Sequence, residues 1–137
     1  MSGHFIGIDV GTGSTRAGIF DRAGRMLATA RRDIALHRDG PDHAEQSSAD
    51  IWQAVCASLR EAMAKAGLAP DDIAGIGFDA TCSLVVLGPG GAPLPVGPHG
   101  DAKRDIIVWM DHRAIDQAER INATGHPVLA YVGGTIS

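Results

Sequence analysis

Residues 6–21, IGIDVGTGSTRAGIFD, contain the pattern on which the fold assignment depends. Apolar residues before and after the glycines predict two short strands, over residues 5–10 and 15–20, with a turn between them. Asp9 stands at the end of the first strand, and Arg16 stands near the start of the second. The stretch therefore predicts a β-hairpin whose tip carries a carboxylate, several hydroxyls and a guanidinium.

The glycines fit neither of two familiar phosphate-binding loops. Gly13 and Gly18 have the spacing of a Walker A loop, but Ile19 stands where that loop needs lysine. Gly11 and Gly13 begin a dinucleotide fingerprint, but Arg16 takes the place of its third glycine. Both motifs also need a helix after the glycines, whereas a β-rich segment follows here.

A turn between two strands can bind phosphate without these motifs. Glycine lets the backbone approach an anion, and successive N–H groups in a tight turn point inward. Mg²⁺ prefers one or two carboxylates plus water and phosphate oxygens, so it can stand between Asp9 and a phosphate. The alternative is a plain hairpin, in which Asp9 and Thr12 make turn hydrogen bonds and Arg16 is solvated. We predict a nucleotide site with Asp9 as metal ligand and phosphate contacts at Gly11, Thr12, Gly13, Ser14 and Arg16.

The following segments predict an α/β fold. A turn at residues 21–24 leads to a third strand over residues 26–36, so the first three strands run antiparallel. After a polar loop (37–46), a helix begins at Ser47 or Ser48, with Asp50 placed as in a capping box, and stops at Gly67. A strand over residues 73–81 follows, and the right-handed crossover makes it parallel to an earlier strand.

Weaker patterns cover the last part of the chain. Residues 83–87 are expected to continue the fourth strand after a kink or bulge. Residues 88–100 are rich in Gly and Pro and predict a surface loop, and residues 106–110 predict a short strand. Asp111 is a good cap for a second helix, which is expected to end near residues 122–125.

Size, charge and cysteines narrow the class of protein. A chain of 137 residues with 45% hydrophobic residues suits one globular domain. The net charge of -4 and the lack of a Lys/Arg run argue against nucleic acid or an anionic membrane as the main partner. Cys56 and Cys82 have no metal-binding spacing, and no signal peptide or membrane span is recognised, so a reduced, cytoplasmic setting is expected.

The pattern Asp9-x-Gly11-Thr12-x-x-x-Arg16 resembles the first phosphate motif of the actin-like ATPase superfamily. Four later segments together resemble the FGGY family of carbohydrate kinases, and most of all its D-ribulokinase-like branch. The resemblance runs from Phe5 to the last residue, and it implies an RNase H-like fold with ATP- and Mg²⁺-dependent phosphorylation of a ketopentose or its polyol. The segments are EQSSADIW (45–52), GIGFDATCSLVVL (75–87), VWMDHRA (108–114) and YVGG (131–134).

The resemblance also assigns the remaining site residues. Asp9 matches the family's metal aspartate, and Thr81 and Cys82 match a strand end that touches sugar. Trp109 and Asp111 match residues that line the same pocket, where an indole face and a carboxylate suit a carbohydrate. Each of the last three residues also has a purely structural alternative: core packing for Trp109, a helix cap for Asp111 and a small buried side chain for Cys82.

For the whole enzyme, the resemblance places the general base and the adenine site in a second half. We therefore expect residues 1–137 to be the N-terminal part of the first kinase domain, incomplete and with negligible turnover by itself. An uncovered sheet edge predicts self-association. D-ribulose is the expected substrate, with L-ribulose, ribitol and xylulose as alternatives. A nucleotide-binding scaffold like actin or Hsp70 and a non-catalytic stub are the competing classes.

Overall fold

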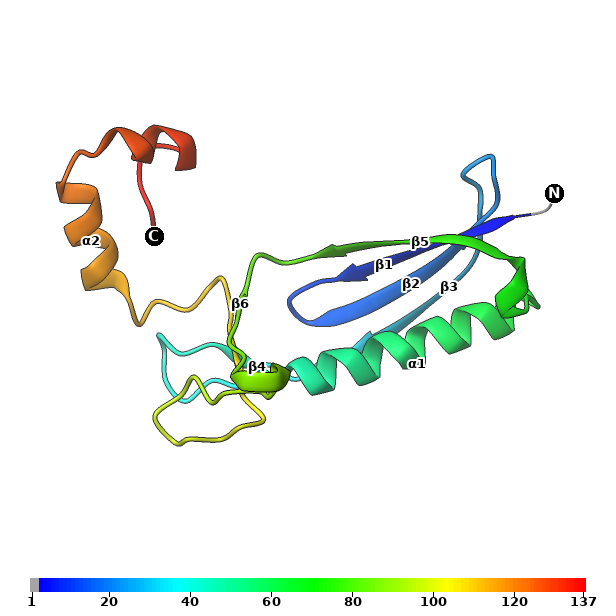
Figure 1. The fold of residues 1–137 in the computed structure, drawn as a ribbon, viewed down its shortest axis with the longest axis horizontal. Coiled ribbons are helices and arrows are strands. Elements are labelled where there is room, and N and C mark those ends of the chain that lie inside the picture. Colours follow the sequence, from blue (N-terminus) through cyan, green and yellow to red (C-terminus); the bar gives the residue numbers. More distant parts are fainter. Residues whose placement is uncertain (1–2) are drawn as a thin grey trace.

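The computed structural model describes residues 3–137 and centres on a four-stranded sheet with one long helix against it (Figure 1). The strand order is β3 (Met26–Asp33), β2 (Ser14–Phe20), β1 (His4–Val10) and β5 (Ile73–Ala80). β1 pairs antiparallel with β2, β2 pairs antiparallel with β3, and β5 pairs parallel with β1. The predicted mixed sheet with three antiparallel opening strands is confirmed.

The third strand ends at Asp33 rather than at residue 36. The N–H of Ile34 donates to the Gly13 carbonyl at 3.2 Å, and the N–H of Ala35 donates to the Asp50 carboxylate at 2.9 Å. These two bonds direct the chain out of the sheet, toward the hairpin tip and the start of the helix. The second bond also corrects the predicted capping box, because the Asp50 carboxylate accepts from the Ala35 N–H instead of from the helix cap.

Helix α1 (Ser48–Ala66) begins and ends as its caps predict. The Ser47 hydroxyl accepts from the N–H of Asp50 at 3.3 Å, and Gly67 closes the helix at φ 65, a left-handed conformation that glycine adopts without strain. The helix packs on one face of the sheet against Ile6, Ile8 and Ile19. Each isoleucine buried in this way contributes about 1.5–3 kcal/mol of hydrophobic stabilisation.

The helix covers β1, β2 and β3 but leaves β5 largely open. Ile76 and Phe78 of β5 lie in register with Ile6 and Ile8 of β1, which face the helix. Nevertheless, Ile76 is 55% exposed and Phe78 is 63% exposed. The far strand of the sheet therefore presents an apolar surface beside the helix.

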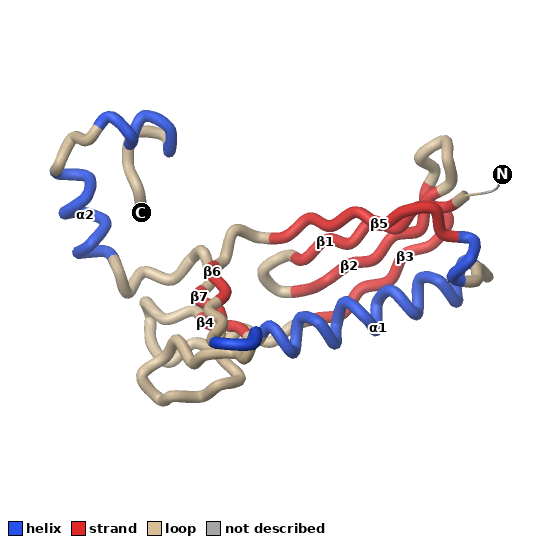
Figure 2. Tube along the Cα trace, viewed as in Figure 1, coloured by secondary structure: helices blue, strands red, loops and turns tan. Residues whose placement is uncertain are grey.

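A second, smaller sheet lies beyond the N-terminus of α1 (Figure 2). It contains β4 (Glu45–Gln46), β7 (Ile106–Ile107) and β6 (Leu84–Val85), in that order and antiparallel. Asp105, just before β7, ties this sheet to the helix, because its carboxylate accepts from the Ser48 N–H at 2.8 Å and from the Ser48 hydroxyl.

This second sheet corrects three predictions. Residues 84–85 do not continue β5, because β1 ends at Val10 and the bond from the Thr81 N–H to the Val10 carbonyl, 3.0 Å long, is the last link between the two strands. The expected loop over residues 37–46 ends in buried β4, and the strand over residues 106–110 shrinks to β7. The ends of three separate segments thus meet beside the hairpin tip.

The C-terminal segment projects away from the main sheet (Figure 1). It contains α2 (Ile115–Ala123), whose cap position is Ala114 and not Asp111 as predicted, because the Asp111 carboxylate binds Ala44 and Arg113 instead. Three 3₁₀ helices occur at Pro70–Asp72, Pro89–Gly91 and Pro127–Val132. Within residues 3–137, none of the helices combines the length and the apolar character that crossing a bilayer requires.

Candidate functional site

The turn between β1 and β2, residues 11–13, is an open loop held at both ends. The Gly11 N–H donates to the Ser14 carbonyl at 3.0 Å, and the Gly13 carbonyl accepts from Ile34. Neither Gly11 nor Gly13 has a left-handed φ, so the backbone conformation does not demand glycine at either position. A Cβ built on Gly13 would meet nothing within 4 Å. The space beside Gly13 is therefore open to a ligand.

Asp9 and Arg16 face each other on the open side of the main sheet. They are register partners across the β1–β2 pair, and the Asp9 carboxylate lies 2.9 Å from the Arg16 guanidinium. Their side chains are 47% and 56% exposed, and both line a cavity of about 490 Å³. The predicted metal ligand is thus neither sealed in the interior nor turned away from the cavity.

The donors around this cavity suit magnesium. Asp79 of β5 is the register partner of Asp9 and lines the same cavity. Residues 3–137 hold no group of three or more His, Cys, Asp or Glu side chains that could bind a metal by themselves. Mg²⁺ needs only one or two carboxylates when water and phosphate oxygens complete its shell, so the Asp9 site fits the ion in the company of a nucleotide.

The hydroxyls next to the turn differ in exposure. Thr12 is partly exposed, whereas Ser14 and Thr15 are buried, and the Thr15 hydroxyl finds no hydrogen-bond partner within residues 3–137. The Thr12 hydroxyl and the backbone of residues 11–13 are therefore more accessible at the tip than the side chain of Ser14. The predicted role of Ser14 stays a prediction.

Two residues that are distant in the sequence donate hydrogen bonds to Thr12. The Gln46 side-chain amide, which is buried in β4, donates to the Thr12 carbonyl at 2.6 Å. The Trp109 indole N–H donates to the Thr12 hydroxyl at 3.0 Å, although 56% of Trp109 is exposed. Gln46 of the second sheet and Trp109, which follows β7, thus both donate to the predicted phosphate turn, residues 11–13.

The Ser83 hydroxyl contacts both of the predicted sugar-side residues Thr81 and Trp109. The hydroxyls of Thr81 and Ser83 lie 3.3 Å apart, and the backbone N–H of Trp109 donates to the Ser83 hydroxyl at 3.3 Å. Thr81 and Ser83 line a cavity of about 240 Å³, and Cys82 between them is exposed as a free thiol. The structure therefore brings Thr81 and Trp109 close to the turn of residues 11–13, whereas a place for Cys82 in the site stays a prediction.

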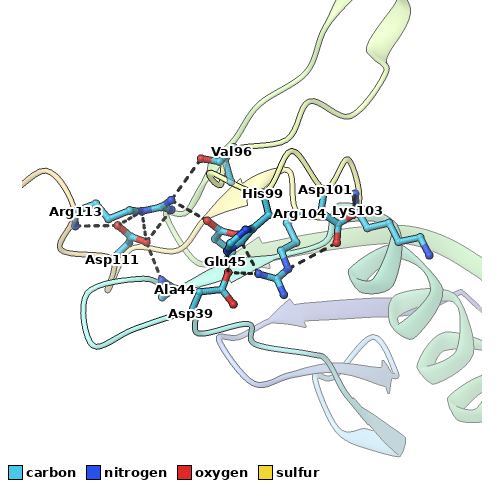
Figure 3. A network of polar contacts seen from close by, with 10 residues as sticks. All are labelled: Asp39, Ala44, Glu45, Val96, His99, Asp101, Lys103, Arg104, Asp111 and Arg113. Carbon is cyan, nitrogen blue, oxygen red and sulfur yellow. Dashed lines mark hydrogen bonds and ion pairs between the residues drawn. The ribbon is translucent and has the colours of Figure 1, made fainter.

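Asp111 lies apart from this group, in a buried ion network (Figure 3). Its carboxylate, only 3% exposed, accepts from the Ala44 N–H at 2.8 Å and from the Arg113 side chain at 2.9 Å. Arg113 also donates to Glu45 at 2.8 Å, and Arg104 pairs with Asp39. For Asp111 to reach a sugar, it would have to exchange one of these partners, so its sugar contact stays a prediction.

The network sets the charge state of Asp111. Burial raises the pKa of the Asp111 carboxyl, but the hydrogen bonds from Arg113 and from the Ala44 N–H outweigh it, so that pKa lies below its ordinary value. The hydrogen bond to Asp111 also raises the pKa of the Arg113 guanidinium. Both groups stay ionised and fix the segment that follows Trp109.

Sequence reasoning did not find Gln46, Ser83, Glu45 or Arg113. Gln46 and Glu45 fall in a polar stretch, and nothing in their spacing shows that this stretch becomes a buried strand. Ser83 is one residue from Cys82, and Arg113 is two residues from Asp111. Both also lie in segments 75–87 and 108–114, which carry the family resemblance, and these are the signals that could have indicated the two residues.

The comparison with protein families agrees with this geometry. Residues 4–132 match the model of the FGGY family of carbohydrate kinases, N-terminal domain. The chain belongs to the FGGY family of carbohydrate kinases. This membership confirms the resemblance and the actin-like ATPase fold that it implied.

Two curated FGGY relatives and one solved structure show the extent of the similarity. An FGGY carbohydrate kinase domain-containing protein of Homo sapiens is 48% identical over 98% of this chain, and a D-ribulokinase of Saccharomyces cerevisiae is 44% identical over 97%. The crystal structure of xylulose kinase from Rhodospirillum rubrum superposes with a TM-score of 0.76, at 27% identity over 94% of this chain. The chain spans 24%, 19% and 25% of these three proteins, respectively.

Proposed function

We propose that the full-length protein transfers the γ-phosphoryl group of ATP to a ketopentose, converting D-ribulose to D-ribulose 5-phosphate. The observation that carries this proposal is the hydrogen bond from the Trp109 indole to the Thr12 hydroxyl, 3.0 Å long. It joins a residue suited to sugar with a residue of the phosphate turn. Donor and acceptor sites that adjoin in this way are what phosphoryl transfer requires, since the reaction depends mainly on positioning and charge stabilisation.

On the nucleotide side, each group has a distinct role. Asp9 would hold Mg²⁺, and the ion would supply positive charge that stabilises the transferred phosphoryl group. Arg16 supplies a further positive charge, and the backbone of residues 11–13 accepts the phosphates closely because Gly13 leaves that space open. The Thr12 hydroxyl donates to a phosphate oxygen.

On the sugar side, the exposed indole of Trp109 offers an apolar face to sugar C–H bonds, and Thr81 with Cys82 borders the same place. Asp111 fixes the segment that follows Trp109 through its ion pair with Arg113. We assign no general base within residues 3–137. We therefore propose that residues 1–137 by themselves turn over negligibly and that a further part of the enzyme supplies the base.

The choice of D-ribulose is supported by the segment TCSLVVL (81–87) and by the similarity to a D-ribulokinase. The similarity to a xylulose kinase keeps D-xylulose, L-ribulose and ribitol as the alternatives to compare. Two free cysteines agree with a reduced, cytoplasmic setting, which we also propose.

The test is a substrate panel on the full-length protein with MgATP. D-ribulose, L-ribulose, ribitol, D-xylulose and glycerol are compared by kcat/KM, because substrate choice is a difference in transition-state stabilisation. We expect the highest value for D-ribulose. A higher value for another sugar would change the substrate, and phosphorylation of none of them would refute the kinase assignment.

A further inference from the structure

We infer that Trp109 is a positioning residue that couples sugar binding to nucleotide binding through the Thr12 hydroxyl. This inference rests on the proposed function and deepens it. Stacking on sugar needs only the indole face, whereas the coupling role uses the indole N–H, which points to the phosphate turn. The two roles belong to different atoms of one side chain, so substitution can separate them.

The hydrogen bond from Trp109 sets the direction of the Thr12 proton. An indole N–H can only donate, so the Thr12 hydroxyl must act as the acceptor in this contact of 3.0 Å. A hydroxyl has one proton and two acceptor positions. Because one acceptor position is taken by the indole, the Thr12 proton is left to donate elsewhere, and phosphate oxygen is the acceptor that this turn is placed to receive.

The backbone of Thr12 is fixed independently of its side chain. The buried Gln46 amide donates to the Thr12 carbonyl at 2.6 Å, so the turn keeps its position whether or not Trp109 is engaged. The hydroxyl can still rotate about χ1 between staggered positions. Trp109 therefore selects one rotamer of Thr12 without being needed to build the turn.

Trp109 is held on its other side by the sugar-side strand end. Its backbone N–H donates to the Ser83 hydroxyl, which lies 3.3 Å from the Thr81 hydroxyl. The ring itself remains 56% exposed, so a sugar can pack against its open face. A sugar that packs against the ring and Thr81 would hold the indole in the orientation that already reaches Thr12. Sugar binding thereby prepares the hydroxyl for phosphate, and by linkage the nucleotide tightens sugar binding equally.

The experiment compares the full-length wild type with Trp109→Phe, which keeps an aromatic face but removes the N–H donor. Calorimetry measures the affinity for the magnesium complex of a non-hydrolysable ATP analogue, with and without saturating D-ribulose. One neutral hydrogen bond predicts that D-ribulose tightens analogue binding by about fivefold in the wild type. In Trp109→Phe, we expect this enhancement to fall below about twofold on the same scale, with the affinity for D-ribulose itself changed by less than about threefold.

Tyr131→Phe is the control, because Tyr131 is 90% exposed in the C-terminal segment, and among the described residues its hydroxyl makes no hydrogen bond to the phosphate turn. It should retain the full enhancement. A double-mutant cycle adds a second readout: in a Thr12→Val background, Trp109→Phe should lower kcat by less than about twofold further, because the partner is already gone.

Two results would overturn the inference in a wild type that phosphorylates D-ribulose. One is a D-ribulose enhancement of analogue binding that survives in Trp109→Phe. The other is a double variant whose loss of kcat equals the product of the losses in Thr12→Val and Trp109→Phe. Either result would leave the kinase function intact. A wild type that phosphorylates none of the sugars would instead remove the proposed function, and the inference with it.

Discussion

The Asp9 carboxylate lies 2.9 Å from the Arg16 guanidinium, directly across the β1–β2 pair, and each side chain is about half exposed. An exposed pair of this kind contributes only about 0–1 kcal/mol to stability. The pair therefore orients the carboxylate without closing it to a stronger partner. In the proposed function, this exposed carboxylate would hold Mg²⁺, and Arg16 would lie beside the phosphates.

Replacing Asp9 by Asn should remove activity without unfolding the protein. The amide is nearly isosteric but carries no charge for Mg²⁺, and losing one such electrostatic contact costs about 100-fold or more in kcat. Steady-state kinetics of the full-length protein across a range of Mg²⁺ concentrations checks this. Asp71→Asn, an exposed carboxylate in the 3₁₀ helix Pro70–Asp72, is the control. More than half of wild-type activity in Asp9→Asn would contradict the assignment.

Gly13→Ala should weaken ATP binding without lowering the stability of the protein. Its φ is not left-handed and a Cβ meets no atom within 4 Å, so the free energy of unfolding should stay the same or rise by up to about 1 kcal/mol. The added methyl group stands where the backbone is expected to approach phosphate, so KM for ATP should rise severalfold. Urea unfolding and initial-rate kinetics are the measurements. An unchanged KM would show that phosphate does not approach Gly13.

The buried ion network should be sensitive to loss of its central acid. Glu45→Ala removes the 2.8 Å bond to Arg113 and one of the charges beside Arg104, while Asp111 and Asp39 still pair with the two arginines. The loss should therefore be about 1.5–3 kcal/mol, the range for a hydrogen bond to a charged group, and stay below that for a buried charge left without any partner. Chemical denaturation measures the change. Asp33→Asn breaks an exposed pair with Arg31 and should cost less than about 1 kcal/mol. Equal losses in the two variants would mean that Glu45 has no special structural role.

Asp111 should make stability depend on pH in acid. Its folded pKa lies below the unfolded value, so its stabilisation is complete above the unfolded pKa of about 3.9 and is lost as the pH falls through the folded pKa. Wild type should therefore lose stability more steeply below about pH 4 than Asp111→Asn, which has no proton to take up. Unfolding midpoints between pH 6 and the lowest pH at which the protein folds provide the comparison; parallel curves would contradict it.

The 137-residue chain should self-associate through the open edge of its sheet. β5 has no second strand partner among the described residues, and Ile76 and Phe78 on it are more than half exposed. Light scattering should show oligomers that become monomers when Phe78→Lys puts a charge on this surface. Monomers in the unsubstituted chain at the same concentration would argue against the prediction.

The main sheet and α1 were predictable because their signals are local. The caps Ser47 and Gly67 and the apolar spacing of the helix act within a few residues, and the crossover rule then fixes β5 beside β1. The exposure of Asp9 has a similar local cause, because side chains alternate between the two faces of a strand and Ile8 faces the helix.

The second sheet was not predictable because its strands have two residues each and are held by distant partners. Nothing near Glu45 indicates that its counter-ion is Arg113, and Asp111 has the sequence of a helix cap but finds two better partners in Ala44 and Arg113. The grip of Gln46 and Trp109 on Thr12 belongs to the same class. Such contacts arise from the packing of whole segments, which propensities do not describe.

The wide separation of Thr12 and Trp109, 97 residues along the chain, has a consequence for biosynthesis. At about 5–20 residues per second, roughly 5 to 20 s pass between translation of the first and of the second. The hairpin and its neighbours can form on the ribosome in that interval, but the turn lacks its indole clamp. Under the coupling proposed above, nascent chains form the hairpin before they contain the residue that links sugar binding to nucleotide binding.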